Sequence, residues 1–402
     1  MSSQSLPSPS SRPGLDASGA RVDVAIIGAG LAGTACALRL HALGHKVALI
    51  DAHAEHAEEF RAEKMGLDHL SLFEKLGLDQ ISKPALTSML DNHVYRLGRL
   101  YSRKDIPEFG FSYAGLVNAL RRAVPSGVLN LVGKVTEIET LPDGRRLVLA
   151  DGTSIDARLV VVSTGLGEAI RRMAGVKRTV LSRAHSLAFG FDLAGRARDY
   201  GFGTLNYYST RREHRYAYLT LFPIGDTMRA NFFTYRDIAD PFVKRFRAEP
   251  QQVLKDLMPE IAPVCGDFEL GGPVSVRPVD LSLSEDYEQP GLVLVGDAFC
   301  TTCPVPGVGI SRVMTDVERL CNVHIPAWLA TPGMGVDKIA AYYRDPVKVE
   351  TDRAGMRVSF YARRVNLGEG LVWRLRHARN QVLRRSLLAL RHPPQAGAGL
   401  GG

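Results

Sequence analysis

The sequence predicts an α/β fold in which a nucleotide-binding domain interlocks with an antiparallel-sheet domain and a helical C-terminal region follows. Three observations lead to this prediction. A strand, a glycine-rich turn, a helix and a second strand follow one another between residues 22 and 51. A second glycine-rich loop follows an apolar strand near residue 296, and an aromatic-rich, alternating stretch lies between the two motifs.

Length and composition bound the organisation of the chain. With 402 residues and 45% hydrophobic content, the chain can bury one large core or two moderate ones. Residues 1–20 are rich in serine, proline and glycine and lack the apolar core of a signal peptide, and residues 393–402 are similar, so we expect two loose tails. No run approaches 18 consecutive apolar residues, which predicts a soluble protein. The five scattered cysteines indicate a cytoplasmic protein without a disulfide scaffold.

The net charge of +8 is concentrated at the C-terminal end. Residues 351–402 hold ten arginines against Asp352 and Glu369, so the rest of the chain is balanced. A nucleic-acid binder would spread its basic residues over the fold, so we predict no nucleic-acid partner. From Leu371 to Leu390 apolar residues recur at helical spacing between arginines. This pattern fits peripheral contact with an anionic membrane, docking on a partner, or a solvated cap on the fold.

The first motif places a full G-x-G-x-x-G directly after a buried strand. Val24 to Ile27 form the apolar run, and Gly28-Ala29-Gly30-Leu31-Ala32-Gly33 follows at once. The first glycine permits the tight turn, the second allows a pyrophosphate to approach the backbone, and the third allows the next helix to pack on the strand. The free N–H groups and dipole of that helix favour phosphate binding. The alternative is a tight glycine turn without a ligand.

An acidic residue stands at the end of this strand–turn–helix–strand unit. Residues 46–50 supply the second strand, which ends in Asp51, 23 residues after Gly28. An acidic residue at this place takes the ribose hydroxyls of an adenine dinucleotide and repels a 2′-phosphate, so NADP is a poor fit here.

The stretch that follows predicts helix and then strands. Residues 52–78 have the apolar spacing and composition of a helix, and Arg61 within them either reaches the dinucleotide phosphates or pairs with a nearby glutamate. Residues 88–101 predict a strand pair with Asn92 in the turn, and residues 111–124 an amphipathic helix. Asp143-Gly144 marks a hairpin, and residues 157–162 a buried strand ending in Ser163-Thr164-Gly165.

An aromatic-rich, alternating region then predicts a second domain. It runs from Val180 to Tyr235 and precedes a helix over about residues 239–258. Its aromatic side chains fit either a packed core or the roof of a ligand site. Apolar Gly291 to Val295 next lead into Gly296-Asp297-Ala298, and Pro304 and Gly307-Val308-Gly309 open a helix over 310–320. One large cofactor touched at both ends explains the two glycine-rich loops.

Together these stretches resemble the class A flavoprotein monooxygenases, the family of para-hydroxybenzoate hydroxylase. The matches are GAGLAG at 28–33 with Asp51, FRAEK at 60–64 and GDAFCTTCPVPGVG at 296–309, followed by Asp316. The resemblance implies an FAD-binding Rossmann-like domain of the glutathione reductase type with an interlocked antiparallel-sheet substrate domain. It also implies that 28–33 hold the ADP half of FAD, that Asp297 binds the ribityl chain and that 304–309 present N–H groups to the flavin ring.

These implications give a set of cofactor-binding residues and a division of the chain. The predicted cofactor-binding residues are Gly28, Ala29, Gly30, Leu31, Ala32, Gly33, Asp51, Ala52, Arg61, Gly165, Gly296, Asp297, Pro304, Gly307, Val308, Gly309 and Ile310. The FAD-binding domain is expected over 21–85, 106–178 and 277–345, the substrate domain over 86–105 and 179–276, and basic helices over 346–392. No metal site is predicted.

The chain departs from the family pattern in three places. Ser163-Thr164-Gly165 stands where the family has Ala-Asp-Gly, an aspartate linked to FAD and pyridine nucleotide. Cys300 replaces a frequent histidine and forms a C-x-x-C with Cys303, which fits either a redox role or small residues packed beside the flavin. Ser311 stands where asparagine is common. Gly201-Phe202-Gly203 lacks a third glycine, so we expect no separate nicotinamide domain and only transient NAD(P)H binding.

No catalytic base can be assigned from the sequence. His185 and Tyr218 are conceivable acid–base groups. The cluster Arg211, Arg212, His214 and Arg215 fits either a carboxylate site or a solvated hairpin turn.

The sequence is interpreted as an FAD-dependent monooxygenase that uses NAD(P)H and O2 to hydroxylate an aromatic or polycyclic small molecule. One alternative is an FAD-dependent reductase or dehydrogenase acting on an isoprenoid-like substrate. Halogenation is less favoured because the chain has only two tryptophans and lacks a paired-tryptophan motif. Another alternative is a non-catalytic FAD-binding protein. The sequence does not define the oligomeric state.

Overall fold

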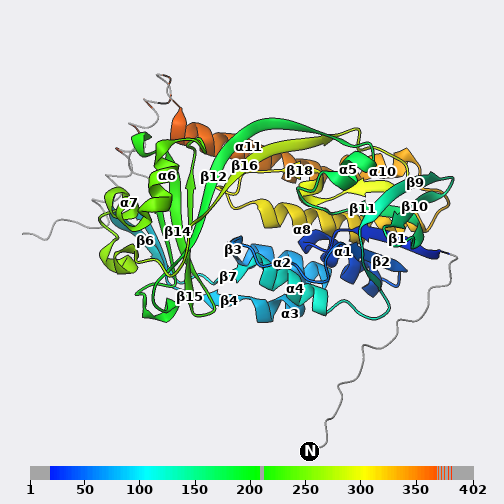
Figure 1. Cartoon of the computed structure of the whole chain (residues 1–402), viewed down its shortest axis with the longest axis horizontal. Helices are drawn as coiled ribbons and strands as arrows, with labels where there is room; N and C mark the ends of the chain where they lie inside the picture. The colour runs from blue at the N-terminus through cyan, green and yellow to red at the C-terminus, as the bar shows by residue number, and fades with distance from the viewer. Residues whose placement is uncertain are drawn as a thin grey trace, which may run out of the picture.

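The computed structural model describes residues 19–208 and 212–368, together with residues 370, 373, 375, 379 and 382. Its fold is mixed α/β with three sheets and a long C-terminal helix, which confirms the predicted fold class at this level (Figure 1). Among the described residues, no helix combines the length and the apolar character needed to cross a bilayer.

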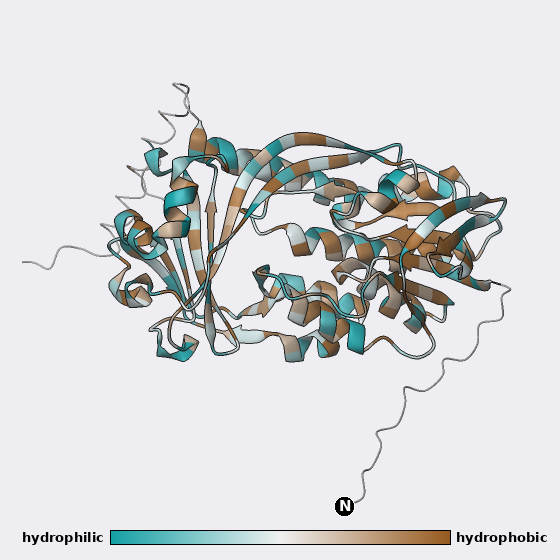
Figure 2. Ribbon diagram, viewed as in Figure 1, coloured by the Kyte–Doolittle hydropathy of each residue, from teal (hydrophilic) through white to brown (hydrophobic). Residues whose placement is uncertain are grey.

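The first sheet carries the glycine-rich motif. Five parallel strands form its centre, and a hairpin extends it. They are β8 (Leu129–Val132), β2 (Val47–Asp51), β1 (Ala20–Ile27), β11 (Ser154–Val162) and β17 (Leu292–Leu294), with the hairpin β9 (Val135–Leu141) and β10 (Gly144–Leu149). The central strands are buried, and Figure 2 shows that they are mostly apolar.

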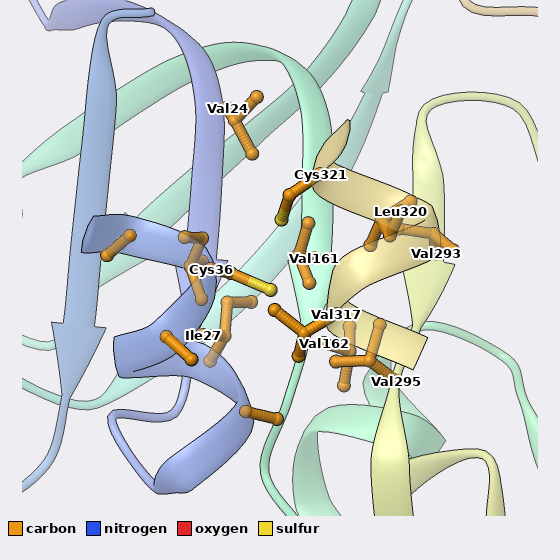
Figure 3. Close-up of a cluster of buried hydrophobic side chains, with 14 of the residues drawn as sticks. Val24, Ile27, Cys36, Val161, Val162, Val293, Val295, Val317, Leu320 and Cys321 are labelled. Atoms are coloured by element: carbon orange, nitrogen blue, oxygen red, sulfur yellow. The ribbon is translucent and has the colours of Figure 1, made fainter. Parts of the chain in front are cut away.

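Helices that pack on this sheet complete the larger core. They are α1 (Leu31–Ala42), α2 (Leu67–Leu76), α3 (Asp79–Ser82), α4 (Tyr113–Arg122), α5 (Ala169–Met173), α8 (Gly309–Arg319), α9 (Ile325–Leu329) and α10 (Val336–Tyr343). Figure 3 shows side chains of β1, α1, β11, β17 and α8 meeting in one cluster, which includes Ile27, Cys36, Val161 and Val317. The unit formed by β1, α1 and β2 is thus fixed to α8, the helix that follows the second glycine-rich loop.

The second sheet is large and mostly antiparallel. Its eight strands are β18 (Cys300–Thr301), β16 (Ser275–Glu285), β12 (Lys177–Leu193), β15 (Thr227–Thr234), β14 (Tyr216–Ile224), β13 (Thr204–Tyr208), β5 (Asn92–Arg96) and β6 (Arg99–Lys104). The pair β13 and β5 is parallel. Helices α6 (Pro241–Ala248) and α7 (Pro250–Leu257) pack on one face in a second core. The long strands β12 and β16 arch back to the first sheet (Figure 1).

A small sheet and a long helix join the two halves. The small sheet consists of β3 (Ala62–Met65), β7 (Glu108–Ser112) and β4 (Thr87–Met89). Helix α11 (Pro346–Leu367) runs along the top of the molecule in Figure 1 and contacts α8. Most of the predicted basic helix that follows it, the predicted tail over 393–402 and residues 1–18 of the predicted N-terminal tail lie outside the described residues, whereas Ala20 begins β1.

Three predicted elements were wrong in detail. Residues 52–61 are irregular and Ala62–Met65 form a strand rather than helix, because they pair with β7. Asn92 begins β5 instead of forming a turn, and Leu97 and Gly98, both with positive φ, connect β5 to β6. The predicted helix over 239–258 is two helices, which meet at Pro250 because proline cannot continue the hydrogen-bond ladder.

Candidate cofactor site and active-site cavity

The first glycine-rich loop has the geometry that its residue pattern predicts. Gly28 has a φ of 101°, and a Cβ at Gly33 would lie 1.8 Å from the carbonyl oxygen of Gly28. Only glycine therefore allows α1 to approach β1 so closely. Helix α1 starts after Gly30 without a side-chain cap, so its first N–H groups are directed into the loop. A Cβ at Gly30 would meet only the Tyr113 hydroxyl within 4 Å, which leaves room for a phosphate.

Asp51 is held beside this loop by an arginine that the sequence did not reveal. Its carboxylate accepts hydrogen bonds from Ala29 N at 2.7 Å and from His53 N at 2.9 Å. Arg121 of α4 donates to the same carboxylate at 3.1 Å and to the carbonyl oxygen of Ala29 at 2.6 Å. Arg121 therefore fixes the acid and the glycine loop relative to each other. Ala52, the next predicted residue, is exposed.

Arg61 lies near the start of α1, although its segment is not helical. Its Nε donates to Glu63 at 2.7 Å, and its guanidinium lies 4.1 Å from the centre of the Tyr113 ring. The Tyr113 hydroxyl accepts a hydrogen bond from Leu31 N at 3.3 Å. Burial would lower the pKa of Arg61, but the charges of Glu63 and Asp297 keep that pKa above its usual value. Arg61 is thus both paired with a glutamate and placed on a cavity wall.

The second glycine-rich loop meets the first. Gly296 has a φ of 61°, and a Cβ there would lie 3.8 Å from the Cβ of Ala32. Asp297 follows and accepts a 2.7 Å hydrogen bond from the buried Arg312. Two loops about 260 residues apart in the sequence therefore lie in contact, as one cofactor touching both requires.

A cavity of about 1040 Å³ opens between the second of these loops and the second sheet, whereas residues 28–33 of the first loop are not on its wall. This volume is at the upper end of the range for ligand sites. Of the predicted cofactor residues, those on its wall are Arg61, Asp297, Pro304, Gly307 and Gly309. Val308 lies on a neighbouring groove and Ile310 is buried. Gly165 accepts a 3.4 Å hydrogen bond from Arg178, which also donates to the Asp297 carbonyl oxygen at 2.9 Å.

The structure supports neither of the two residues considered as acid–base groups as a catalytic base. His185 is fully buried, contacts Ser182 Oγ and the carbonyl oxygen of Ser359, and does not line the cavity. Burial lowers its pKa. Tyr218 does line the cavity, but its hydroxyl donates to the Val305 carbonyl oxygen at 3.0 Å, and burial raises its pKa. In the predicted basic cluster, Arg211 and the Arg212 side chain lie outside the described residues.

The C-x-x-C thiols are packed into the wall beside the Gly-Asp loop. Cys300 and Cys303 are both buried and free, and Cys303 lines the cavity. Burial raises the pKa of Cys300 to about 11 and also raises the pKa of Cys303. The thiolate is the reactive form of cysteine, so this geometry favours the packing role over the redox role.

Comparison with known proteins identifies similar chains. The family described as lycopene cyclase protein matches residues 23–194. The 3-demethoxyubiquinol 3-hydroxylase of Escherichia coli K12 is 26% identical over 332 residues, which cover 76% of this chain and 80% of that protein.

Solved structures share the fold over most of their length. The p-nitrophenol 4-monooxygenase PnpA of Pseudomonas putida DLL-E4 aligns with a TM-score of 0.70 at 16% identity, covering 92% of this chain and 98% of that one. PqsL of Pseudomonas aeruginosa, a probable FAD-dependent monooxygenase, gives 0.69 at 17% identity, covering 87% and 97%. The flavin-dependent brominase Bmp2 gives 0.67 at 17% identity, covering 91% and 93%. These comparisons confirm the resemblance predicted from the sequence motifs.

Proposed function

We propose that this protein, an FAD-dependent oxidoreductase that resembles the class A flavoprotein monooxygenases, uses NAD(P)H and O2 to hydroxylate an aromatic or polycyclic small molecule. The observation that carries the proposal is the contact between the two glycine-rich loops, the second of which leads into the wall of a large cavity whose opposite wall is the aromatic face of the second sheet.

The residues present fit FAD. The unit of β1, α1 and β2 is assigned as a Rossmann-like domain of the glutathione reductase type, in which the loop 28–33 and Asp51 would hold the ADP half. Arg61 would meet the phosphates, Asp297 the ribityl chain and the loop 304–309 the flavin ring. Bound FAD would supply electron transfer from the nicotinamide and the activation of O2. In this proposal, residues 21–85, 106–178 and 277–345 form the FAD-binding domain, and residues 86–105 and 179–276 form the substrate domain.

The side chains of this protein would position and enclose the reactants rather than transfer a proton. Tyr208, Tyr218 and Phe233 form an aromatic wall, with ring centres 5.4 Å and 5.1 Å apart in turn. Tyr218 also hydrogen-bonds the 304–309 loop, so the wall and the predicted flavin loop are held at a fixed separation. A wall of this kind excludes water from the reacting centre.

The nicotinamide step would use a loop that differs from the family pattern. Ser163 donates through its hydroxyl to the carbonyl oxygens of Ile27 and Gly28 at 3.0 Å and 2.7 Å. Arg178 connects Gly165 to the backbone of Asp297. The loop is therefore anchored by a serine and an arginine without the aspartate that the family links to the pyridine nucleotide, so transient NAD(P)H binding rests on the resemblance alone.

The decisive experiment is spectroscopic and then kinetic. We expect purified protein to bind FAD with a flavin absorbance spectrum, to be reduced by NADH or NADPH without oxygen, and to consume O2 faster when an aromatic substrate is present. An Asp297→Ala variant should weaken FAD binding, whereas Asp286→Ala, a change at an exposed acid, should not. A colourless protein that refuses FAD would refute the proposal. Reduction of an isoprenoid-like substrate without stoichiometric O2 uptake would instead establish the reductase alternative.

A further inference from the structure

The cavity wall contains a row of uncharged hydrogen-bonding side chains that the cofactor assignment does not use. In the register of the second sheet, Asn206 of β13 faces Thr220 of β14, and Thr220 faces Asn231 of β15. All three side chains line the cavity. We call them the polar row.

Strand alternation places the polar row on the cavity face. The neighbouring residues Leu205, Leu219 and Phe232 are fully buried in the core under α6 and α7, so their strand neighbours project to the opposite face. Two positions further along, the same strands carry the aromatic wall of Tyr208, Tyr218 and Phe233. A flat ring lying against the aromatic wall would therefore present its edge to the polar row.

The hydroxyl of Thr220, in the middle of the polar row, is available to a ligand. Its side chain is 4% exposed, and its hydroxyl has no hydrogen-bond partner among the described residues. A buried hydroxyl without a partner costs about 1–3 kcal/mol, so a ligand that satisfies it gains binding energy. Asn231 donates its side-chain N–H to the carbonyl oxygen of Ala62 at 2.8 Å, which leaves its side-chain oxygen as an acceptor toward the cavity. The row can thus both donate and accept.

Charges close to the row are already paired. Lys64 and Glu108 on the cavity wall form an ion pair at 2.7 Å, and Arg61 pairs with Glu63 at 2.7 Å. Arg96 lies with its guanidinium 4.0 Å from the centre of the Tyr208 ring. An anionic ligand would have to break one of these contacts, whereas a neutral oxygen would not.

We propose that the polar row recognises an uncharged hydroxyl or keto oxygen on a planar ring substrate, and that the aromatic wall holds the ring. The inference rests on the proposed function, because it names the substrate class of the same cavity. It selects neutral phenols, quinols and ring ketones over aromatic carboxylates.

The test uses the FAD-loaded protein and three bicyclic probes of similar shape. Binding of 2-naphthol, naphthalene and 2-naphthoate is measured at neutral pH from the change that each produces in the flavin absorbance spectrum. Because one neutral hydrogen bond contributes about 0.5–1.5 kcal/mol, we expect 2-naphthol to bind about two- to tenfold more tightly than either other probe. Thr220→Val should weaken the binding of 2-naphthol about three- to tenfold and leave the binding of naphthalene unchanged. Thr227→Val, at an exposed threonine of β15, is the matched control.

The outcomes separate this inference from the function itself. Binding of 2-naphthoate as tight as that of 2-naphthol, particularly if Arg96→Met abolishes it, would show an anion site and overturn the inference. An equal effect of Thr220→Val on all three probes, or no spectral change with any probe, would also overturn it. Failure to bind FAD would instead refute the proposed function, and the normal flavin spectrum of the Thr220→Val protein checks that its fold is intact.

Discussion

Arg312 of α8 is buried to 1% exposure and donates a 2.7 Å hydrogen bond to the carboxylate of Asp297 on the cavity wall. The same guanidinium lies 3.6 Å from Asp352 of α11. Lys348 of α11 in turn bonds Asp316 at 2.8 Å and Asp352 at 2.9 Å. The acid predicted to bind the ribityl chain is therefore supported by a buried charge network that reaches the C-terminal helix.

Replacing this arginine tests the network. We expect Arg312→Met to lower the free energy of unfolding by about 3 kcal/mol, because it leaves buried carboxylates without a cation, and to weaken FAD binding. Urea denaturation and FAD titration measure the two effects. Arg353→Met, at an exposed residue of the neighbouring helix α11, should change stability by less than about 0.5 kcal/mol. Unchanged FAD affinity in Arg312→Met would mean that Asp297 is oriented without it.

Arg121 should contribute to cofactor affinity without touching the flavin ring. It joins Asp51 to the backbone of the glycine loop, so Arg121→Gln should allow both to move and should weaken FAD binding about tenfold. Arg122→Gln, the next residue on the same helix, is exposed and serves as control. The prediction fails if the two variants bind FAD equally well.

The close packing of the first loop makes Gly33 intolerant of any side chain. Gly33→Ala would place a Cβ 1.8 Å from a backbone oxygen, so we expect lost FAD binding and a large fall in melting temperature. Gly44→Ala is the contrasting change, because Gly44 has a φ of 85° and no atom within 4 Å of its Cβ position. That variant should cost only about 1–2 kcal/mol of backbone strain and should retain FAD.

The geometry of the two glycine-rich loops could be predicted because local spacing encodes it. The strand, glycine turn and helix from Val24 to Gly33 are a local pattern, and so is the Gly296-Asp297 loop after its apolar strand. Assuming one shared cofactor predicted that the two loops lie near each other, but it did not predict the close approach of Gly296 to Ala32. Each of these features depends either on residues close together in the chain or on the assumption that one cofactor touches both loops.

Other features depend on contacts that no local pattern records. Arg121 is one of two adjacent arginines on an amphipathic helix, and only the packing of α4 beside Asp51 distinguishes it from Arg122. The strand at 62–65 has a helical composition, but pairing with β7 determines its conformation. The polar row requires the register of three strands, which the alternating pattern of each strand does not specify.

The buried thiols of Cys300 and Cys303 should be unreactive in the folded protein. Because burial raises the pKa of both thiols, we expect no reaction of Cys300 or Cys303 with iodoacetamide in the folded protein at neutral pH. A Cys300→Ser, Cys303→Ser double variant should be reduced by NAD(P)H at a rate within about twofold of the parent protein. Mass spectrometry detects alkylation, and anaerobic stopped-flow absorbance measures reduction. Rapid alkylation in the native state, or loss of reduction in the variant, would favour the redox role.

Asp345 should make the stability of the protein depend on acid pH. This buried acid begins α11 and accepts hydrogen bonds from Arg319 at 2.9 Å and from His324 at 2.9 Å. Burial would raise its pKa, but these bonds and the N–H of Lys348 lower that pKa from 3.8 to about 2. A lowered folded-state pKa stabilises the fold above the unfolded value, so the contribution is fully present above about pH 4 and is lost as pH falls toward 2.

We therefore expect Asp345→Asn to lower the free energy of unfolding by on the order of 1–2 kcal/mol at pH 6, with a difference from the parent protein that shrinks by pH 3. Urea denaturation at both pH values measures this difference. Asp105→Asn, at an exposed acid, should follow the parent protein at each pH. A difference of constant size between pH 6 and pH 3 would show that the Asp345 carboxylate charge does not stabilise α11, and that its effect comes from neutral hydrogen bonds that asparagine cannot reproduce.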